Sequence, residues 1–123
     1  MATILLVDDD EMVQSVTSEL LTLLGYEVIA ADDGKQAIAK AKDNSDLIDL
    51  VLLDLSLPDM TGFDLLPLLR EILQPRAKIV LCSGSMCEQY EDVDLEEKDL
   101  DAVLQKPFEL SLLKETVEKV LAS

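Results

Sequence analysis

Short apolar runs alternate along the chain with longer stretches in which apolar residues recur at helical spacing. The short runs are typical of buried strands and predict five of them: Thr3–Val7, Tyr26–Ala30, Leu47–Leu53, Ala77–Cys82 and Asp101–Gln105. The helical spacing predicts five helices: Glu11–Leu24, Gly34–Lys42, Phe63–Leu73, Met86–Glu97 and Glu109–Leu121. No linker or low-complexity segment separates these elements, so we expect residues 1–123 to form one domain.

The same spacing predicts which helical residues face the core. In the first helix these are Val13, Val16, Leu20, Leu23 and Leu24. In the second helix they are Ala37, Ile38 and Ala41, and in the last helix Leu113, Val117, Val120 and Leu121. Pro67 falls inside the third predicted helix, where it would lack a hydrogen bond unless Asp64 is the N-cap. The sequence leaves these two possibilities for Pro67 open.

The alternation of strands and helices predicts the fold class. Strands that are apolar on both faces indicate a parallel sheet covered by helices on both sides. With right-handed crossovers, the expected architecture is α/β, a flavodoxin-like doubly wound sheet of five strands in the order 2-1-3-4-5. Any site is then expected at the carboxyl ends of the strands.

Composition and charge exclude several classes of function. Against 10 Lys and Arg residues stand 26 Asp and Glu residues, so the net charge is −16, which disfavours direct binding to nucleic acid or to a membrane surface. The absence of His excludes catalytic triads and Cys/His zinc sites. Two isolated cysteines, Cys82 and Cys87, and an N-terminus without signal-peptide features favour a reducing, cytoplasmic location.

Polar residues follow four of the predicted strands. Asp8, Asp9 and Asp10 follow the first strand, Asp54 the third, Ser83 ends the fourth and Lys106 follows the fifth. In a parallel sheet these ends meet at one edge, where clustered carboxylates repel each other and favour a divalent cation such as Mg²⁺. Asp54 could then accept a phosphoryl group, with the Ser83 hydroxyl and the Lys106 ammonium binding its oxygens.

Each of these residues also has an ordinary structural interpretation. Asp10 is as well explained as a helix cap with a favourable dipole interaction. A single aspartate at a strand end, a Ser-Gly pair such as Ser83-Gly84 and a Lys-Pro pair are all common in turns and loops. Their gathering at one edge of one sheet is what favours the chemical interpretation.

With these residues in place, the sequence resembles the receiver domains of two-component response regulators over its whole length. The matching motifs are Ile4–Asp10, Val51–Gly62, Val80–Gly84 and Lys106–Phe108. The resemblance implies that Asp54 is the phosphoacceptor and takes its phosphoryl group from a histidine on a sensor kinase or phosphotransfer protein. It also implies that the domain catalyses its own phosphorylation and slow dephosphorylation, then changes the surface that docks a downstream protein target.

The resemblance also assigns roles to the remaining site residues. Mg²⁺ would be bound by Asp9, Asp54 and the backbone carbonyl of Ser56, with Asp8 acting largely through water. Ser83 and Lys106 would contact the phosphoryl group, with Gly84 as a binding residue beside Ser83. Val103 stands where the family usually has an aromatic switch residue.

Alternative functions fit the residues less well. A flavodoxin-type electron carrier shares the fold, but Asp8-Asp9-Asp10 would repel a flavin phosphate. A haloacid dehalogenase-type hydrolase needs a second carboxylate two residues after its nucleophile, where this chain has Ser56. A phosphate-independent, receiver-like protein-binding module remains the main alternative. The chain is interpreted as a single-domain regulator or as the C-terminal receiver of a hybrid sensor kinase, monomeric or dimerising on phosphorylation.

Overall fold

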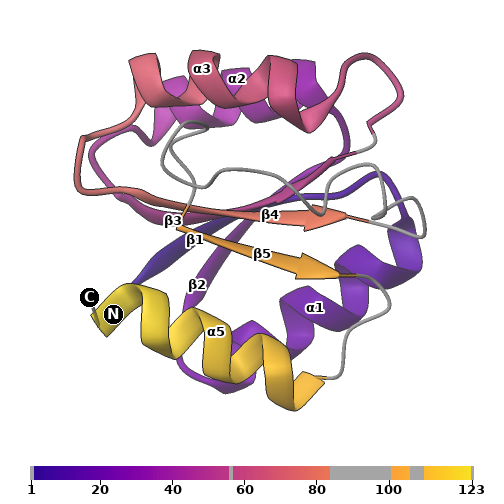
Figure 1. Ribbon diagram of the computed structural model, residues 1–123, viewed down its shortest axis with the longest axis vertical. Helices are drawn as coiled ribbons and strands as arrows, with labels where there is room; N and C mark the ends of the chain where they lie inside the picture. Colours follow the sequence, from indigo (N-terminus) through magenta and orange to yellow (C-terminus); the bar gives the residue numbers. More distant parts are fainter. Residues whose placement is uncertain (1, 56, 84–100, 106–109, 123) are drawn as a thin grey trace.

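The strands form one five-stranded parallel sheet in the order β2-β1-β3-β4-β5 (Figure 1). The computed structural model describes residues 2–55, 57–83, 101–105 and 110–122. The strands are β1 Thr3–Val7, β2 Glu27–Ala31, β3 Ile48–Asp54, β4 Lys78–Ser83 and β5 Ala102–Gln105. The predicted flavodoxin-like fold class and its strand order are therefore confirmed.

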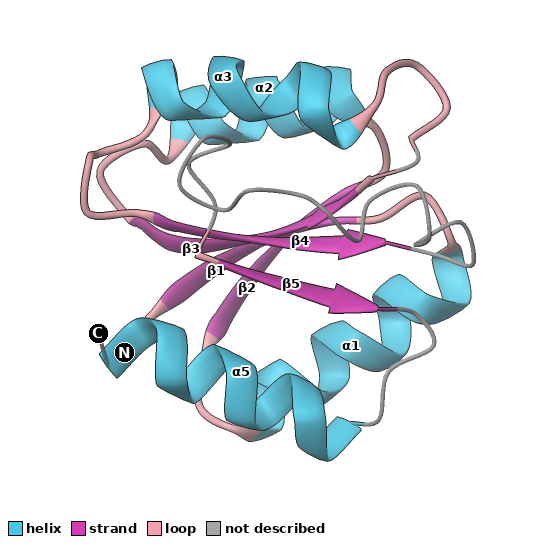
Figure 2. Cartoon of the chain, in the orientation of Figure 1, coloured by secondary structure: helices cyan, strands magenta, loops and turns pink. Residues whose placement is uncertain are grey.

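Helices cover both faces of the sheet, as Figure 2 shows. The described helices are α1 Glu11–Leu23, α2 Gly34–Asp43, α3 Gly62–Ile72 and α5 Leu110–Ala122. α1 and α5 pack on one face, while α2 and α3 lie side by side on the other. The predicted helix Met86–Glu97 lies outside the described residues. In the described part of the chain, no helix has the length and apolarity needed to cross a membrane.

The alternation of side chains along each strand divides the core into two layers. In β1, Leu5 and Val7 pack toward α2 and α3, whereas Ile4 and Leu6 pack toward α1 and α5. All four side chains are buried, and full burial of one such side chain stabilises a fold by about 1.5–3 kcal/mol. This burial on both faces explains why the strands read as continuous apolar runs in the sequence. Cys82 in β4 is one of these buried strand residues, as predicted.

Four predicted strands begin one residue too early: β2, β3, β4 and β5 start directly after the predicted first residues Tyr26, Leu47, Ala77 and Asp101. Tyr26 belongs to the turn after α1, because its backbone N–H donates to the Leu21 carbonyl and Gly25 takes a positive φ of 97°. Leu47 precedes β3 in a turn, where its N–H donates to the Asn44 carbonyl and its side chain is exposed. At Tyr26 and Leu47, the apolar side chain next to the strand led to a predicted strand that is one residue too long at its start. The backbone of each residue belongs to the preceding turn.

The predicted core face of α1 is wrong in phase. Val16 and Leu23, which were expected inside, are exposed, whereas Thr17 and Leu21 are the buried residues of this helix. Val13, Leu20 and Leu24 are only partly buried. The predictions for α2 and α5 are confirmed at their centres: Ala37, Ala41, Leu113, Val117 and Val120 are buried, and Ile38 and Leu121 pack against the two core layers.

The position of Pro67 in α3 is resolved by the N-cap of the helix. Thr61, not Asp64, is the cap, and its hydroxyl accepts the Asp64 N–H at 3.1 Å. Pro67 therefore lies in the helix interior and has no N–H to donate to the Phe63 carbonyl one turn earlier. Pro67 itself is exposed.

Candidate functional site

The site begins with two neighbouring strands that end side by side. β1 and β3 are hydrogen-bonded parallel partners, and Val7 pairs with Leu53. Asp54 is the last residue of β3, and Asp8 and Asp9 directly follow β1. Because parallel strands end at the same edge, the fold brings the adjacent carboxylates of Asp8 and Asp9 together with that of Asp54, which is far from them in the sequence.

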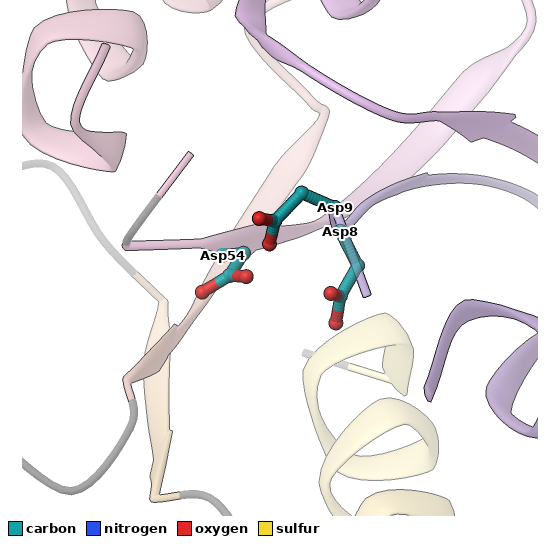
Figure 3. Close-up of side chains that lie close together, drawn as sticks. All are labelled: Asp8, Asp9 and Asp54. Carbon is teal, nitrogen blue, oxygen red and sulfur yellow. The ribbon is translucent and has the colours of Figure 1, made fainter. Parts of the chain in front are cut away.

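The three carboxylates form a compact cluster at this edge (Figure 3). One carboxylate oxygen from each of Asp8, Asp9 and Asp54 lies within 4.8 Å of the others. Asp8 and Asp54 are 4% and 6% exposed, whereas Asp9 is exposed to solvent. The cluster therefore has a buried floor and one carboxylate at the surface. This confirms the prediction that Asp8, Asp9 and Asp54 meet. Their individual roles stay predictions.

Asp10 is the N-cap of α1, one of its two predicted interpretations. Its carboxylate accepts the backbone N–H groups of Met12 at 3.0 Å and Val13 at 3.2 Å. The Asp10 N–H in turn donates to the Asp8 carboxylate at 2.9 Å. This last bond links the start of α1 to the cluster and orients the side chain of Asp8.

Gln14 supports the same edge and was not predicted. Its side-chain amide donates to the backbone carbonyls of Asp8 at 2.9 Å and Ala31 at 3.1 Å, and to the Asp32 carboxylate at 2.9 Å. It thus joins the ends of β1 and β2 to the loop before α2. The available signal was a polar residue one turn before Thr17, on the face of α1 that is actually buried.

The backbone around Asp54 is fixed by its neighbours on both sides. The Leu55 N–H donates to the Cys82 carbonyl of β4 at 2.9 Å, and the Gly62 N–H donates to the Leu55 carbonyl at 2.7 Å. A Cβ at position 62 would lie 2.8 Å from the Asp54 carbonyl oxygen, closer than real Cβ atoms come. Only glycine therefore lets α3 begin this near to Asp54.

Of the remaining predicted site residues, Ser83 alone belongs to the described part of the chain. Ser83 is the last residue of β4, one position beyond the residue that pairs with Asp54, so its backbone lies at the same edge of the sheet. Nothing is described of its side chain. Ser56, Gly84 and Lys106 lie outside the described residues, and their roles stay predictions.

The chemistry of the cluster follows from its donor atoms. Three carboxylates at one point repel each other, and a divalent cation relieves that repulsion. Hard cations such as Mg²⁺ prefer oxygen ligands, commonly one or two carboxylates together with water and phosphate oxygens. The residues present therefore fit a magnesium site beside a buried aspartate that could act as a nucleophile.

Comparison with known proteins places the cluster in a wider context. The family model described as "Response regulator receiver domain" matches residues 4–118. The chain is 33% identical to the chemotaxis protein CheY of Bacillus subtilis, over 96% of this chain and 96% of CheY. It is 39% identical to the transcriptional regulatory protein CpxR of Escherichia coli over 88% of this chain, but it spans only 44% of CpxR.

A solved structure shares the fold at similar identity. The response regulator TrrA of Thermotoga maritima, determined in complex with Mg²⁺ and BeF, is 31% identical with a TM-score of 0.81. The match covers 98% of this chain and 99% of that structure.

Proposed function

Because the chain belongs to the response regulator receiver domain family, we propose that it is a phosphorylation-controlled signalling switch in which Asp54 is the phosphoacceptor. The observation that carries this proposal is the carboxylate cluster, in which the oxygens of Asp8, Asp9 and Asp54 lie within 4.8 Å of one another. The phosphoryl group would come from a phosphohistidine of a sensor kinase or phosphotransfer protein.

In the proposed reaction, a carboxylate oxygen of Asp54 attacks the phosphorus atom. A P–O bond forms to Asp54, the P–N bond to the donor histidine breaks, and the donor imidazole keeps the electron pair and takes up a proton. Asp54 is held for this step by the rigid end of β3, with its backbone fixed by Leu55 and Gly62. Because Asp54 is buried, a phosphodonor would reach its carboxylate only from the edge of the sheet.

Asp8, Asp9 and Asp54 are the residues proposed to hold Mg²⁺, with the Ser56 carbonyl as a further predicted ligand. When bound, the ion offsets the negative charge of the carboxylates and of the incoming phosphoryl oxygens. The TrrA structure, which holds Mg²⁺ and BeF, supports this proposal by analogy. The roles of Ser83, Gly84 and Lys106 at the phosphoryl group stay predictions.

We extend the proposal to the later steps of the switch. The domain is proposed to catalyse its own transfer reaction and its slow dephosphorylation, in which water releases phosphate from Asp54. Phosphorylation then alters the surface that docks a downstream protein target. The single-domain extent 1–123, the oligomeric state and the cytoplasmic location stay predictions.

The test is intact mass spectrometry after incubation with acetyl phosphate, with and without Mg²⁺. Wild type is expected to gain the mass of one phosphoryl group only when Mg²⁺ is present, and Asp54→Asn is expected to gain none. Asp49→Asn is the matched control, because Asp49 lies on the same strand at its other end. It should be phosphorylated like wild type.

The opposite result would favour the main alternative. A folded wild type that gains no phosphoryl group, and is not stabilised by Mg²⁺ with beryllofluoride, would indicate a phosphate-independent binding module. An Asp54→Asn protein that is still phosphorylated would show that the acceptor lies elsewhere.

A further inference from the structure

A carboxylate outside the cluster connects the loop after Asp54 to a neighbouring helix. Asp59, in the loop between β3 and α3, accepts the backbone N–H of Gly34 at 2.9 Å on one oxygen and that of Lys35 at 3.0 Å on the other. Both N–H groups belong to the first turn of α2, where helical N–H groups lack partners within the helix. The contact joins segments that are 25 and 24 positions apart in the sequence.

Packing beside this contact holds the same loop. A Cβ at position 34 would lie 2.5 Å from the Met60 sulfur, so Met60 rests directly on the backbone of Gly34. Gly34 is buried, and Met60 also packs against the core layer beneath α2 and α3. The loop is therefore attached to α2 by a double hydrogen bond and by an adjacent apolar contact.

A backbone hydrogen bond closes the base of the same loop. The Gly62 N–H donates to the Leu55 carbonyl at 2.7 Å, which closes the segment between Asp54 and α3. Together with the contacts of Asp59 and Met60, this bond fixes Leu55 at one end of the loop and Asp59 and Met60 farther along it. By sequence, the same segment contains Ser56, the predicted carbonyl ligand of Mg²⁺.

The electrostatic setting favours the ionised form of Asp59. The Gly34 N–H, more than any other group, lowers the pKa of this carboxyl, with the Lys35 N–H and the Lys35 charge acting in the same direction. The carboxylate also lies at the positive end of the α2 dipole. At neutral pH it is therefore a charged acceptor, which makes stronger hydrogen bonds than a neutral one.

We propose that Asp59 is a positioning residue for metal-dependent phosphorylation: by fixing the β3–α3 loop to the start of α2, it holds the segment after Asp54 in the conformation that binds Mg²⁺. This inference rests on the proposed function. Asp59 contacts none of the three clustered carboxylates through any described bond, and it acts through the loop. Residues that orient metal ligands from outside the ligand shell commonly affect metal affinity.

The experiment compares two carboxylates at the same helix end. Asp59→Ala removes the contact between loop and helix, whereas Asp33→Ala removes the N-cap of α2, which accepts the Gln36 N–H at 2.7 Å within its own helix. Both variants weaken the start of α2, but only Asp59→Ala releases the loop. Asp59→Asn is the conservative variant, since its amide oxygen can still accept one of the two bonds.

Two quantities are measured for each protein. The Mg²⁺ dissociation constant comes from isothermal titration calorimetry, and hydrogen exchange of the Gly34 and Lys35 amides reports on the contact itself. Asp59→Ala is expected to raise the Mg²⁺ dissociation constant about three- to tenfold and to speed exchange at both amides. Asp33→Ala should stay within about twofold of wild type in Mg²⁺ binding, and Asp59→Asn should fall between them.

The outcomes separate this inference from the proposed function. If Asp59→Ala binds Mg²⁺ like wild type, or no more weakly than Asp33→Ala, Asp59 is only a structural residue and the inference is wrong. If wild type itself binds no Mg²⁺, the proposed function fails and the inference fails with it. If Asp59→Ala does not fold, Asp59→Asn decides, with about a two- to threefold loss expected and no loss contradicting the inference.

Discussion

The two edges of the sheet use aspartate in opposite ways. At the amino edge, where strands begin, Arg70 pairs with Asp101 at 3.2 Å and Arg76 pairs with Asp49. At the carboxyl edge, where strands end, three aspartates are instead brought within 4.8 Å of one another. The same residue type therefore stabilises the fold at one edge and concentrates negative charge at the other.

At the amino edge, each paired aspartate accepts hydrogen bonds from both an arginine and a backbone N–H. The Asp101 carboxylate also accepts the Ile79 N–H at 2.8 Å, and Arg70 donates to the Ala77 carbonyl at 2.6 Å. Asp49 accepts the Thr3 N–H at 2.9 Å as well as the guanidinium of Arg76. These carboxylates connect strand starts to the loops beside them, which is a stabilising role.

At the carboxyl edge, the clustered carboxylates repel each other, and a bound cation would offset that repulsion. We therefore expect Asp9→Asn to lose most of the stabilisation that Mg²⁺ gives to wild type. At a Mg²⁺ concentration one hundredfold above its dissociation constant, binding stabilises the wild-type fold by about 2.7 kcal/mol. The variant should gain less than about half of this, as measured by thermal unfolding with Mg²⁺ and with EDTA.

Without Mg²⁺, Asp9→Asn should be at least as stable as wild type, because one of three repelling charges is removed. A clear loss of stability in EDTA would mean that Asp9 serves the fold as the aspartates of the amino edge do. The contrast between the edges would then be wrong.

The complementary variant lies at the amino edge. Asp101→Ala is expected to lower the free energy of unfolding by about 2 kcal/mol, because it leaves the Arg70 guanidinium and the Ile79 N–H without this acceptor. Urea denaturation measures the loss, and Mg²⁺ affinity should not change. Asp101→Asn keeps an acceptor for Ile79 and should lose less. A loss below about 0.5 kcal/mol would show that the amino edge is not held by this pair.

Asp59 lies near the carboxyl edge, yet its carboxylate accepts backbone N–H groups as the amino-edge aspartates do. Its pKa is lowered from 3.8, chiefly by the Gly34 N–H, so its charged form stabilises the fold above that pH. This contribution is lost as the pH falls through the lowered pKa. The stability difference between wild type and Asp59→Asn, measured by urea titrations, should thus be constant from neutral pH to about 5 and shrink as the pH falls further through 3.8 and the lowered pKa. A difference that grows on acidification would contradict this assignment.

The smallest effect is expected at Tyr26, beside the start of β2. Burial, and then the negative charge of Glu118, raise the pKa of its phenol above 10.0. Glu118→Gln should bring the pKa part of the way back. Ultraviolet absorbance titration measures this, with Tyr26→Phe used to subtract the other tyrosine. A Tyr26 that ionises at or below 10.0 would show that this end of the sheet is wetter than the structure indicates.

Much of the fold could be predicted because burial on both faces leaves a plain pattern. A strand of a covered parallel sheet is apolar along most of its length. The strand predicted at Thr3–Val7 therefore has its true bounds, and the strand predicted at Leu47–Leu53 is displaced by one residue from β3. The meeting of Asp8, Asp9 and Asp54 followed from the topology alone, because parallel neighbours end at one edge.

The phase of α1 could not be predicted from apolar spacing. The helix presents Gln14 and Thr17 toward the sheet, and the Gln14 amide is needed there for the strand-end carbonyls. Apolar Val16 and Leu23 are consequently left exposed. A rule that places apolar residues inside fails where a polar side chain satisfies buried backbone groups.

The contact of Asp59 with α2 could not be predicted from the sequence, for a different reason. Its partners are backbone N–H groups of Gly34 and Lys35, which carry no mark in the amino-acid sequence. Nearly every residue type carries a backbone N–H, so these donors do not stand out in a sequence. Only the packing of the β3–α3 loop on α2 shows that Asp59 has partners beyond the turn in which it lies.

We propose that Asp54, within the carboxylate cluster at the carboxyl edge, is the acceptor of a phosphoryl group. The most direct measurement is to treat the chain with acetyl phosphate and Mg²⁺, reduce the acyl phosphate with borohydride, and locate the product by peptide mass spectrometry. We expect homoserine at position 54 and nowhere else. Homoserine at another aspartate, or none in a folded protein that retains Mg²⁺, would contradict this proposal.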